Sequence, residues 1–210
     1  MLKPQTASPK NLSSAVELQV TPVSAFTDNY IWLIHAPSQP RRVVAVDPGD
    51  ASAVLMTLQD QQLELGGILI THHHADHVGG VLELLSHYNV PIYGPATENI
   101  PGEPQRVSDG DTVMLTELGL KFEVLDIPGH TAGHVAYLGH NSLFCGDTLF
   151  SAGCGRLFEG TPAQMTTSLS RLSAVPADTR VYCTHEYTLA NLCFALTVDP
   201  NNQIAKQHFQ

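Results

Sequence analysis

The chain has 210 residues, of which 43% are hydrophobic and 14% charged, and its formal net charge at pH 7 is −10. This size and balance predict one compact domain rather than a disordered chain. The sequence has no basic run to cover a phosphate backbone and no apolar run near the ~20 residues of a membrane helix. We therefore expect neither a nucleic-acid partner nor a membrane.

The four cysteines show none of the paired spacings that mark cysteine-ligated metal sites. They are Cys145, Cys154, Cys183 and Cys193. In a chain of this size they are typical of reduced, small hydrophobic residues, which predicts a cytoplasmic protein. We expect it to be a monomer.

The first part of the chain predicts a strand-rich unit. Residues 1–14 contain Pro, Ser and Lys without periodicity and are expected to be a loose leader. Alternating or continuous apolar runs then predict strands over residues 15–20, 29–35, 42–46 and 67–70. Asp50 can cap a helix that carries Val54, Leu55 and Leu58 on one face.

The rest of the chain alternates in the same way. Helices are predicted over residues 76–88, from Thr161 to Leu172, and after His185. Strands are predicted over residues 90–93, 112–115, 120–127, 135–138, 142–145 and 181–183, with a polar crossing over 97–110. Strands in both halves with helices between them favour an α/β (α+β) fold of two packed sheets with helices outside.

The segment Thr71–His77 carries the strongest chemical signal, because it follows the apolar run of residues 67–70. Side chains alternate at a strand end, so His72 and His74 can point one way and His73 another. Asp76 and His77 lie where the next helix begins. Histidine and carboxylate ligands in this pattern suit a divalent metal such as zinc. A solvated histidine run or an expression tag is the alternative, but tags lie at chain ends.

Three more candidate ligands follow later strands: His130, Asp147 and His185. Each alone could be a turn residue or a hydrogen-bonded structural residue. Together they supply what two divalent ions need. One set would be His72, His74 and His130, the other Asp76, His77 and His185, and Asp147 would bridge them. Zinc is the first choice of metal, and iron or manganese would accept the same donors.

Asp47, in the turn after the strand over residues 42–46, could hold a ligand imidazole from outside the metal sites. A turn-forming role is the equal alternative. Asp76, besides binding metal, could orient a hydroxide ion that the metals would bind.

The sequence resembles the metallo-β-lactamase superfamily through the His-x-His-x-Asp-His loop of residues 72–77. Within it, the chain closely resembles glyoxalase II, the hydroxyacylglutathione hydrolases. The matching segments are Phe26–Trp32, Val46–Asp50, Thr71–Gly80, Pro128–His134, Cys145–Gly160 and His185–Thr188. The Gly-Cys-Gly-Arg and His-Glu-Tyr-Thr blocks are specific to the subfamily, whereas the histidine loop marks only the superfamily.

The resemblance implies an αββα sandwich of two mixed sheets and the same metal-ligand sets. It implies hydrolysis of S-2-hydroxyacylglutathione, such as S-D-lactoylglutathione, to glutathione and a 2-hydroxy acid in methylglyoxal detoxification. Asp76 and Asp147 would then be catalytic. Arg156 and Tyr187 would contact the glutathione part of the substrate. Phe158 stands where relatives can carry tyrosine, so a hydroxyl contact there would be missing.

One departure from the family concerns the end of the chain. Glyoxalase II proteins carry a helical C-terminal region with basic residues that hold glutathione. Here residues 15–198 would be the catalytic domain and residues 199–210 a stub of that region. The alternatives are another hydrolase of this fold, a mono-iron persulfide dioxygenase, or a metal-binding fragment that is inactive without the C-terminal region.

Overall fold

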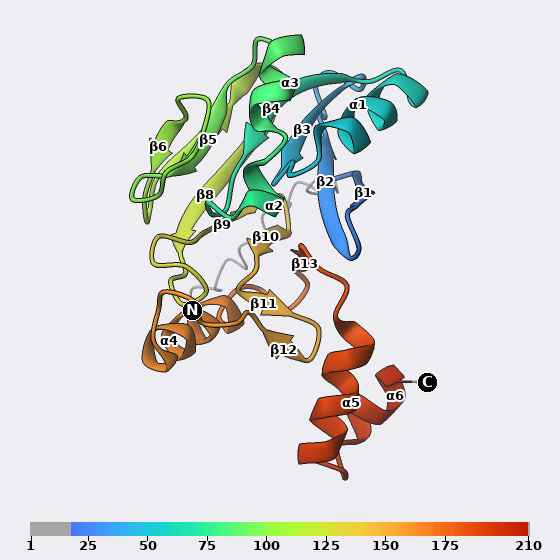
Figure 1. Cartoon of the computed structure of the whole chain (residues 1–210), viewed down its shortest axis with the longest axis vertical. Coiled ribbons are helices and arrows are strands. Elements are labelled where there is room, and N and C mark those ends of the chain that lie inside the picture. Colours follow the sequence, from blue (N-terminus) through green and yellow to red (C-terminus); the bar gives the residue numbers. More distant parts are fainter. Residues whose placement is uncertain (1–17, 210) are drawn as a thin grey trace, which may run out of the picture.

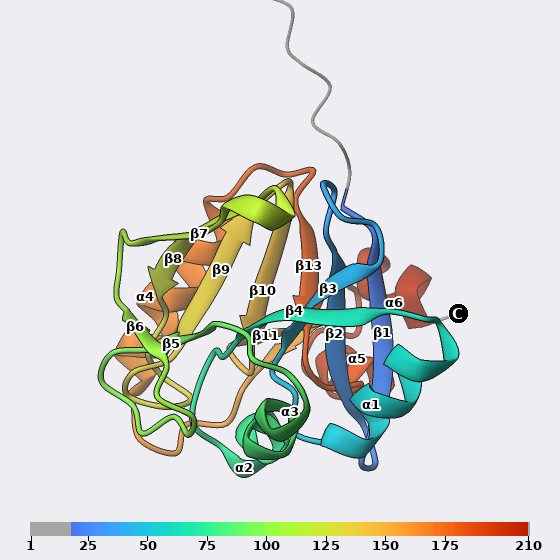
Figure 2. The ribbon, with the colours of Figure 1, turned by 90° about the horizontal axis from the view of Figure 1, so that it is seen from above.

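Two mixed β-sheets face each other in the computed structural model, which describes residues 18–209 (Figures 1 and 2). The first has the order β1 (Val20–Ala25), β2 (Asn29–His35), β3 (Arg42–Val46), β4 (Glu64–Leu69), β5 (Ile92–Pro95), β6 (Gln105–Val107). The second has the order β13 (Arg180–Cys183), β10 (Ser142–Gly146), β9 (Val135–Gly139), β8 (Leu120–Asp126), β7 (Thr112–Leu115). Strands β3 to β6 pair in parallel, as do β10 and β13, and the remaining pairs are antiparallel.

The apolar alternation along the strands builds the layers. Val44 and Val46 of β3 point between the sheets and pack in one cluster with Phe122 of the second sheet. Val43 and Ala45, on the opposite face of the same strand, join the cluster that lies under the helices. Successive strand residues point to opposite faces, so one short run serves two cores.

Helices cover the outer face of each sheet. Helices α1 (Ala51–Asp60) and α3 (Val81–His87) contribute Val54 and Leu84 to the core of the first sheet. Helix α4 (Pro162–Ser173) places Leu172 on the outer face of the second sheet. Figure 1 shows these helices on either side of the paired sheets. The predicted αββα arrangement is therefore confirmed.

The predicted helix starts are also present. The Asp50 carboxylate accepts from the backbone N–H groups of Ser52 and Ala53 at 2.9 and 3.2 Å. Thr161 and Gln164 cap each other's backbone N–H groups, and Pro162 is the first residue of α4. Short elements complete the fold: α2 (Ala75–Val78), the 3-10 turn η1 (Thr116–Leu118), β11 (Leu149–Phe150), β12 (Gly153–Cys154), α5 (Thr188–Val198) and α6 (Gln203–Phe209). The last two lie side by side beyond β13 (Figure 1).

The single helix predicted over residues 76–88 is wrong, because the chain breaks it into α2 and α3 at Gly79 and Gly80. The Gly80 N–H donates to Pro48 O at 3.1 Å. A Cβ on Gly80 would lie 2.5 Å from that oxygen and from the Ala51 nitrogen. The close approach of the turn after β3 therefore requires glycine here and ends the helix.

Two strand predictions also need correction. The strand predicted over residues 15–20 is absent at Leu18 and Gln19, and residues 15–17 lie outside the described part of the chain. The strand instead runs from Val20 to Ala25 and includes Pro22, which is tolerated because β1 is an edge strand. Strand β6 was missed inside the predicted polar crossing, where its three residues give little periodicity.

The predicted domain limits stay predictions. The leader predicted over residues 1–14 lies outside the described residues. The boundary predicted between residues 15–198 and residues 199–210 is followed by helix α6. Across residues 18–209, no helix combines the length and apolar character that crossing a bilayer requires.

Candidate metal centre

The predicted ligands meet at one edge of the two sheets. His72, His74, Asp76 and His77 follow β4, His130 follows β8, Asp147 follows β10, and His185 follows β13. Each follows the carboxyl end of its strand, where the backbone leaves the sheet. Four separate loops thus bring their imidazoles and carboxylates into one cluster, as the sequence predicted.

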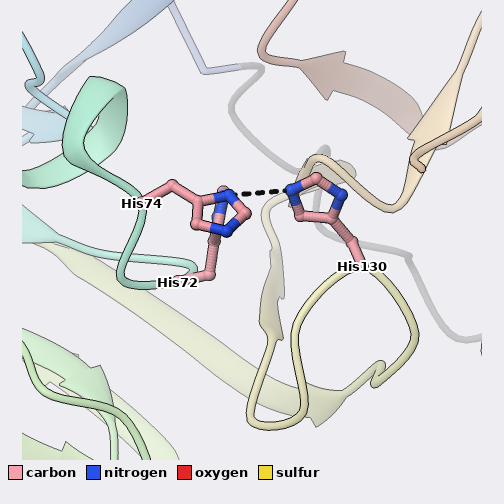
Figure 3. Close-up of side chains that lie close together, drawn as sticks. All are labelled: His72, His74 and His130. Carbon is pink, nitrogen blue, oxygen red and sulfur yellow. Dashed lines mark hydrogen bonds between the residues drawn. The ribbon is translucent and has the colours of Figure 1, made fainter. Parts of the chain in front are cut away.

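The first set contains His72, His74 and His130 (Figure 3). The Nδ1 atom of His74 lies 3.1 Å from His72 Nε2 and 3.0 Å from His130 Nε2. Three imidazole nitrogens from two loops therefore converge on one small space. Histidine nitrogens in such a group are typical ligands of a divalent transition metal.

The second set contains Asp76, His77 and His185, whose ligand atoms all lie within 4.8 Å of one another. The Oδ2 atom of Asp76 is 3.4 Å from Nε2 of His77 and 3.4 Å from Nε2 of His185. His77 and His185 are buried, whereas Asp76 is partly exposed. The carboxylate can therefore be reached from solvent while the imidazoles are held by the protein.

Asp147 lies between the two sets. Its Oδ2 atom is 3.3 Å from His130 Nε2 in the first set and 3.3 Å from His185 Nε2 in the second. Its Oδ1 atom is 3.4 Å from His77 Nε2 and accepts a hydrogen bond from the Thr184 hydroxyl. A carboxylate in this position faces both groups of nitrogens at once.

The imidazoles of the first set have lowered pKa values, which suits them to bind a cation. Burial lowers the pKa of His72 well below its ordinary value, and neighbouring imidazoles lower it further. Burial likewise lowers the pKa values of His74 and His130. Because these rings are neutral at pH 7, each has a nitrogen lone pair to offer to a metal.

In the second set the pKa values of the two imidazoles are raised rather than lowered. Burial lowers the pKa of His77, but the Asp47 and Asp76 carboxylates outweigh it and raise that pKa to about 10. Burial also lowers the pKa of His185, but the Asp147 and Asp76 carboxylates outweigh it and raise that pKa to about 10. The pKa of Asp76 is lowered, first by the imidazole of His185 and then by that of His77. Burial raises the pKa of Asp147, but His185, His77 and the Thr184 hydroxyl together outweigh burial and lower that pKa.

The residues present fit a pair of divalent cations. In the part of the chain that the structure describes, both ring nitrogens of His77 are buried and neither has a partner in hydrogen-bond geometry. Leaving such buried polar atoms unpaired is costly, so an unseen partner is expected. Two groups of nitrogen and oxygen donors with a carboxylate between them are the donor set of a two-metal site.

Asp47 lies directly behind this cluster. Its two oxygens accept from the Thr71 backbone N–H at 2.8 Å and from the Thr71 hydroxyl at 2.7 Å. Its Oδ2 atom is also 3.2 Å from Nδ1 of His77, and the backbone of Asp47 has a φ of 51°. The contacts place Asp47 against the His77 ring and the positive φ fits a turn residue, so both roles predicted for Asp47 stay predictions.

Sequence reasoning missed Asp28, in the turn between β1 and β2, and Asn29, the first residue of β2. Asp28 Oδ1 accepts from His185 Nδ1 at 2.8 Å, and the Asn29 amide donates to Asp76 Oδ2 at 2.9 Å. Both lie in the Phe26–Trp32 segment, which carries part of the family resemblance. A polar pair in a tight turn beside a strand was the available signal, but turns commonly carry such residues.

His134 was also missed, although it lies in the segment Pro128–His134. It is fully buried, its ring stacks on that of His72 at 4.6 Å, and its Nε2 atom accepts from the Asp147 backbone N–H at 3.2 Å. Burial lowers its pKa to about 3, so the ring is neutral and can accept this bond. His134 thereby holds the turn that carries Asp147.

A pocket of about 510 Å³ opens over the cluster. Arg156, Phe158 and Tyr187, the predicted substrate contacts, line it together with His74, Asp76, His130, Asp147, His185, Ala75, Gly155 and Phe150. The Tyr187 ring stacks on His185 at 5.0 Å, and the Arg156 guanidinium lies 5.0 Å above the Phe158 ring. The site is therefore a concave surface with metal donors on its floor and aromatic and cationic groups on its wall.

Comparison with protein families decides the class. The family model of the metallo-beta-lactamase superfamily matches residues 27–185. The hydroxyacylglutathione hydrolase of Photobacterium profundum is 59% identical over 186 residues, which are 88% of this chain and 72% of that protein. The chain belongs to the metallo-beta-lactamase superfamily and, within it, to the hydroxyacylglutathione hydrolase family.

A second curated relative and two solved structures are also similar to this chain. The hydroxyacylglutathione hydrolase of Nitrosomonas eutropha is 54% identical over 185 residues, covering 88% of this chain and 71% of that protein. The crystal structure of TTHA1623 in a di-iron-bound form superposes with a TM-score of 0.68 at 30% identity, covering 80% of this chain and 92% of that one. ETHE1 from Myxococcus xanthus gives a TM-score of 0.67 at 30% identity, covering 81% and 76%.

Proposed function

We propose that this hydroxyacylglutathione hydrolase family member cleaves S-2-hydroxyacylglutathione thioesters, such as S-D-lactoylglutathione. Water adds to the acyl carbon and the carbon–sulfur bond breaks, giving glutathione and a 2-hydroxy acid such as D-lactate. The observation that carries the proposal is the position of the Asp147 carboxylate. Its Oδ2 atom lies 3.3 Å from Nε2 of His130 and 3.3 Å from Nε2 of His185, so it faces both donor sets. The family's curated relatives bear the name of this activity.

In this proposal His72, His74 and His130 hold one cation, and Asp76, His77 and His185 hold the other, with Asp147 shared. We take the metal to be zinc, because imidazole and carboxylate donors suit it, and the same donors accept iron or manganese. The cations, when bound, would supply Lewis acidity that polarises the thioester carbonyl and makes a water molecule nucleophilic near neutral pH.

The protein's own groups orient the reactants. Asp76 is partly exposed to the pocket and is held by the Asn29 amide, so its carboxylate can accept a hydrogen bond from the attacking water. Arg156 is exposed on the pocket wall, where a guanidinium suits the carbonyl and carboxylate groups of a peptide such as glutathione. Phe158 and Tyr187 offer flat apolar surface to the rest of the substrate.

The cellular setting is a further part of the proposal. All four cysteines are free thiols. Free thiols suit a reducing compartment, which supports a cytoplasmic enzyme of methylglyoxal degradation.

The experiment is metal analysis of the protein as purified, together with turnover of S-D-lactoylglutathione and of glutathione persulfide by the same sample. We expect two cations per chain and thiol release that a strong chelator abolishes. The matched substrate is the lactoyl thioester of a simple thiol, which should react more slowly because it lacks the peptide that Arg156 would hold.

Each alternative has its own signature in this experiment. One iron per chain with oxygen-dependent consumption of glutathione persulfide would replace the hydrolase by a dioxygenase. Equal turnover of both thioesters would indicate a hydrolase without glutathione specificity. Two bound cations without thioester cleavage would indicate a metal-binding module.

A further inference from the structure

Glu98 is a buried acidic residue that the proposed chemistry does not use. It follows β5, its side chain is only 4% exposed, and its backbone carbonyl accepts from the Arg106 guanidinium. It does not line the pocket over the metal ligands. Burying a carboxylate is costly unless every oxygen is satisfied, so its contacts deserve an explanation of their own.

The two oxygens of Glu98 join the two loops that carry the first ligand set. Oε1 accepts from the Thr131 hydroxyl and from the Gly133 backbone N–H at 3.0 Å, both in the loop of His130. Oε2 accepts from His73 Nδ1 at 3.0 Å, in the loop of His72 and His74. A Cβ on Gly133 would lie 2.7 Å from Glu98 Cγ, so this close approach depends on glycine.

His73 extends the connection to the pocket wall. Its Nε2 atom lies 3.3 Å from Glu159 Oε1, and Glu159 Oε2 accepts from the Ala132 backbone N–H at 2.8 Å. Glu159 follows Phe158, whose own N–H donates to His130 O at 3.2 Å. The side-chain contacts from Glu98 through His73 to Glu159 therefore link both ligand loops to the loop that bears Arg156 and Phe158.

The geometry also explains why His73 points away from the cluster of predicted metal ligands. Its ring is fixed outward by the two carboxylates, and side chains alternate along the extended segment. His72 and His74 are thereby turned inward to the cluster of Figure 3. Glu98, His73 and Glu159 could themselves be taken for a cation site. Both Glu98 oxygens already accept from protein donors, however, which favours a structural connection.

We propose that Glu98, acting through His73, is a positioning residue of the metal centre: it fixes the distance between the His72–His74 loop and the His130 loop, and through Glu159 the position of the substrate wall. This rests on the proposed metal sites. Residues hydrogen-bonded to metal ligands typically contribute about tenfold to hundredfold to metal affinity, and we expect an effect within this range when the loops that carry the ligands shift.

The test is equilibrium competition for Zn²⁺ between the protein and a coloured chelator. Glu98→Ala and His73→Ala should each lose one cation at about tenfold to hundredfold lower chelator concentration than the wild type. Glu98→Gln keeps an oxygen for Thr131 and Gly133 and should recover part of the loss. Glu123→Gln, on the exposed face of β8, is the matched control and should follow the wild-type curve. Michaelis constants should rise in Glu98→Ala, because the substrate wall is displaced.

Circular dichroism of each metal-free variant separates this role from misfolding. His73 is partly exposed, so His73→Ala should fold even where Glu98→Ala does not. A folded His73→Ala with the wild-type competition curve would overturn the proposal. Three cations in the wild type and two in His73→Ala would overturn it as well, in favour of a third metal site. A wild-type chain that binds no cation would instead overturn the proposed function, and this inference with it.

Discussion

The carboxylate of Asp28 lies 2.8 Å from Nδ1 of His185, although 157 residues separate them in the chain. The next residue, Asn29, donates to Asp76 at 2.9 Å. The end of the turn between β1 and β2 and the start of β2 thus hold two of the three side chains of the second predicted ligand set. With Nδ1 engaged by Asp28, the other nitrogen of His185 faces Asp76 and Asp147.

Replacing Asp28 by asparagine should therefore weaken the second cation site. Asparagine keeps the size of the side chain but loses the negative charge that orients and polarises the imidazole. We expect about tenfold to hundredfold weaker binding of one of the two cations, measured by chelator competition. Asp60→Asn, on the exposed end of α1, is the control. Equal affinities in Asp28→Asn and the wild type would contradict the role.

Removing the shared carboxylate should have a larger effect. In Asp147→Ala neither ligand set keeps the anion that faces both, so we expect at most one firmly bound cation per chain. Turnover should fall by at least about 100-fold, since metal polarisation contributes several kcal/mol to catalysis. Elemental analysis after gel filtration gives the metal content. A variant that retains two cations would argue against a bridging Asp147.

The sequence predicted that the candidate ligands cluster because their signal is local. A dense histidine loop after an apolar run, and single residues after three more strands, indicate one edge of a sandwich. Glu98, Asp28 and His134 carry no such signal. Glu98 meets Thr131 33 residues later, and Asp28 meets His185 only after the sheets have packed. An isolated acid in a polar segment is also typical of a solvated surface.

The same reasoning explains the fold predictions. The apolar run of β3 predicted a strand, and the Thr161 capping box predicted the start of α4. The break between α2 and α3 depends instead on the turn after β3 approaching Gly80, a contact between distant parts of the chain. The apolar periodicity of residues 76–88 therefore predicted one helix without this break.

Metal binding should release protons. His77 and His185 have pKa values raised to about 10 in the metal-free cluster, so both carry a proton at pH 7 that a cation must displace. Asp76 and Asp147 have lowered pKa values and are already ionised, so they release none. Apparent Zn²⁺ affinity should consequently rise as the pH increases from 6 to 9. Calorimetry in buffers of different ionisation enthalpy counts the protons, and a count of zero would contradict the assignment.

Gly80→Ala tests the packing behind the metal loop. The added Cβ would lie 2.5 Å from the Pro48 carbonyl oxygen and 2.5 Å from the Ala51 backbone nitrogen, and these backbone atoms can shift little. We expect a loss of about 1–3 kcal/mol in the free energy of unfolding. Denaturant titration of the metal-free protein measures it without a contribution from bound cations. Glu83→Ala, on the exposed face of α3, should change this free energy by less than about 0.5 kcal/mol.

Arg156→Ala should separate substrate binding from chemistry. The guanidinium is exposed on the pocket wall and contacts Phe158, so its removal leaves the metal ligands in place. A charge-assisted hydrogen bond to the glutathione part contributes about 1.5–3 kcal/mol in both the bound substrate and the transition state. The Michaelis constant for S-D-lactoylglutathione should accordingly rise by at least about tenfold with little change in kcat. Arg41→Ala, in the exposed turn between β2 and β3, should alter neither constant. An unchanged Michaelis constant in Arg156→Ala would remove this residue from the substrate site, whereas a fall in kcat alone would place it in the chemical step.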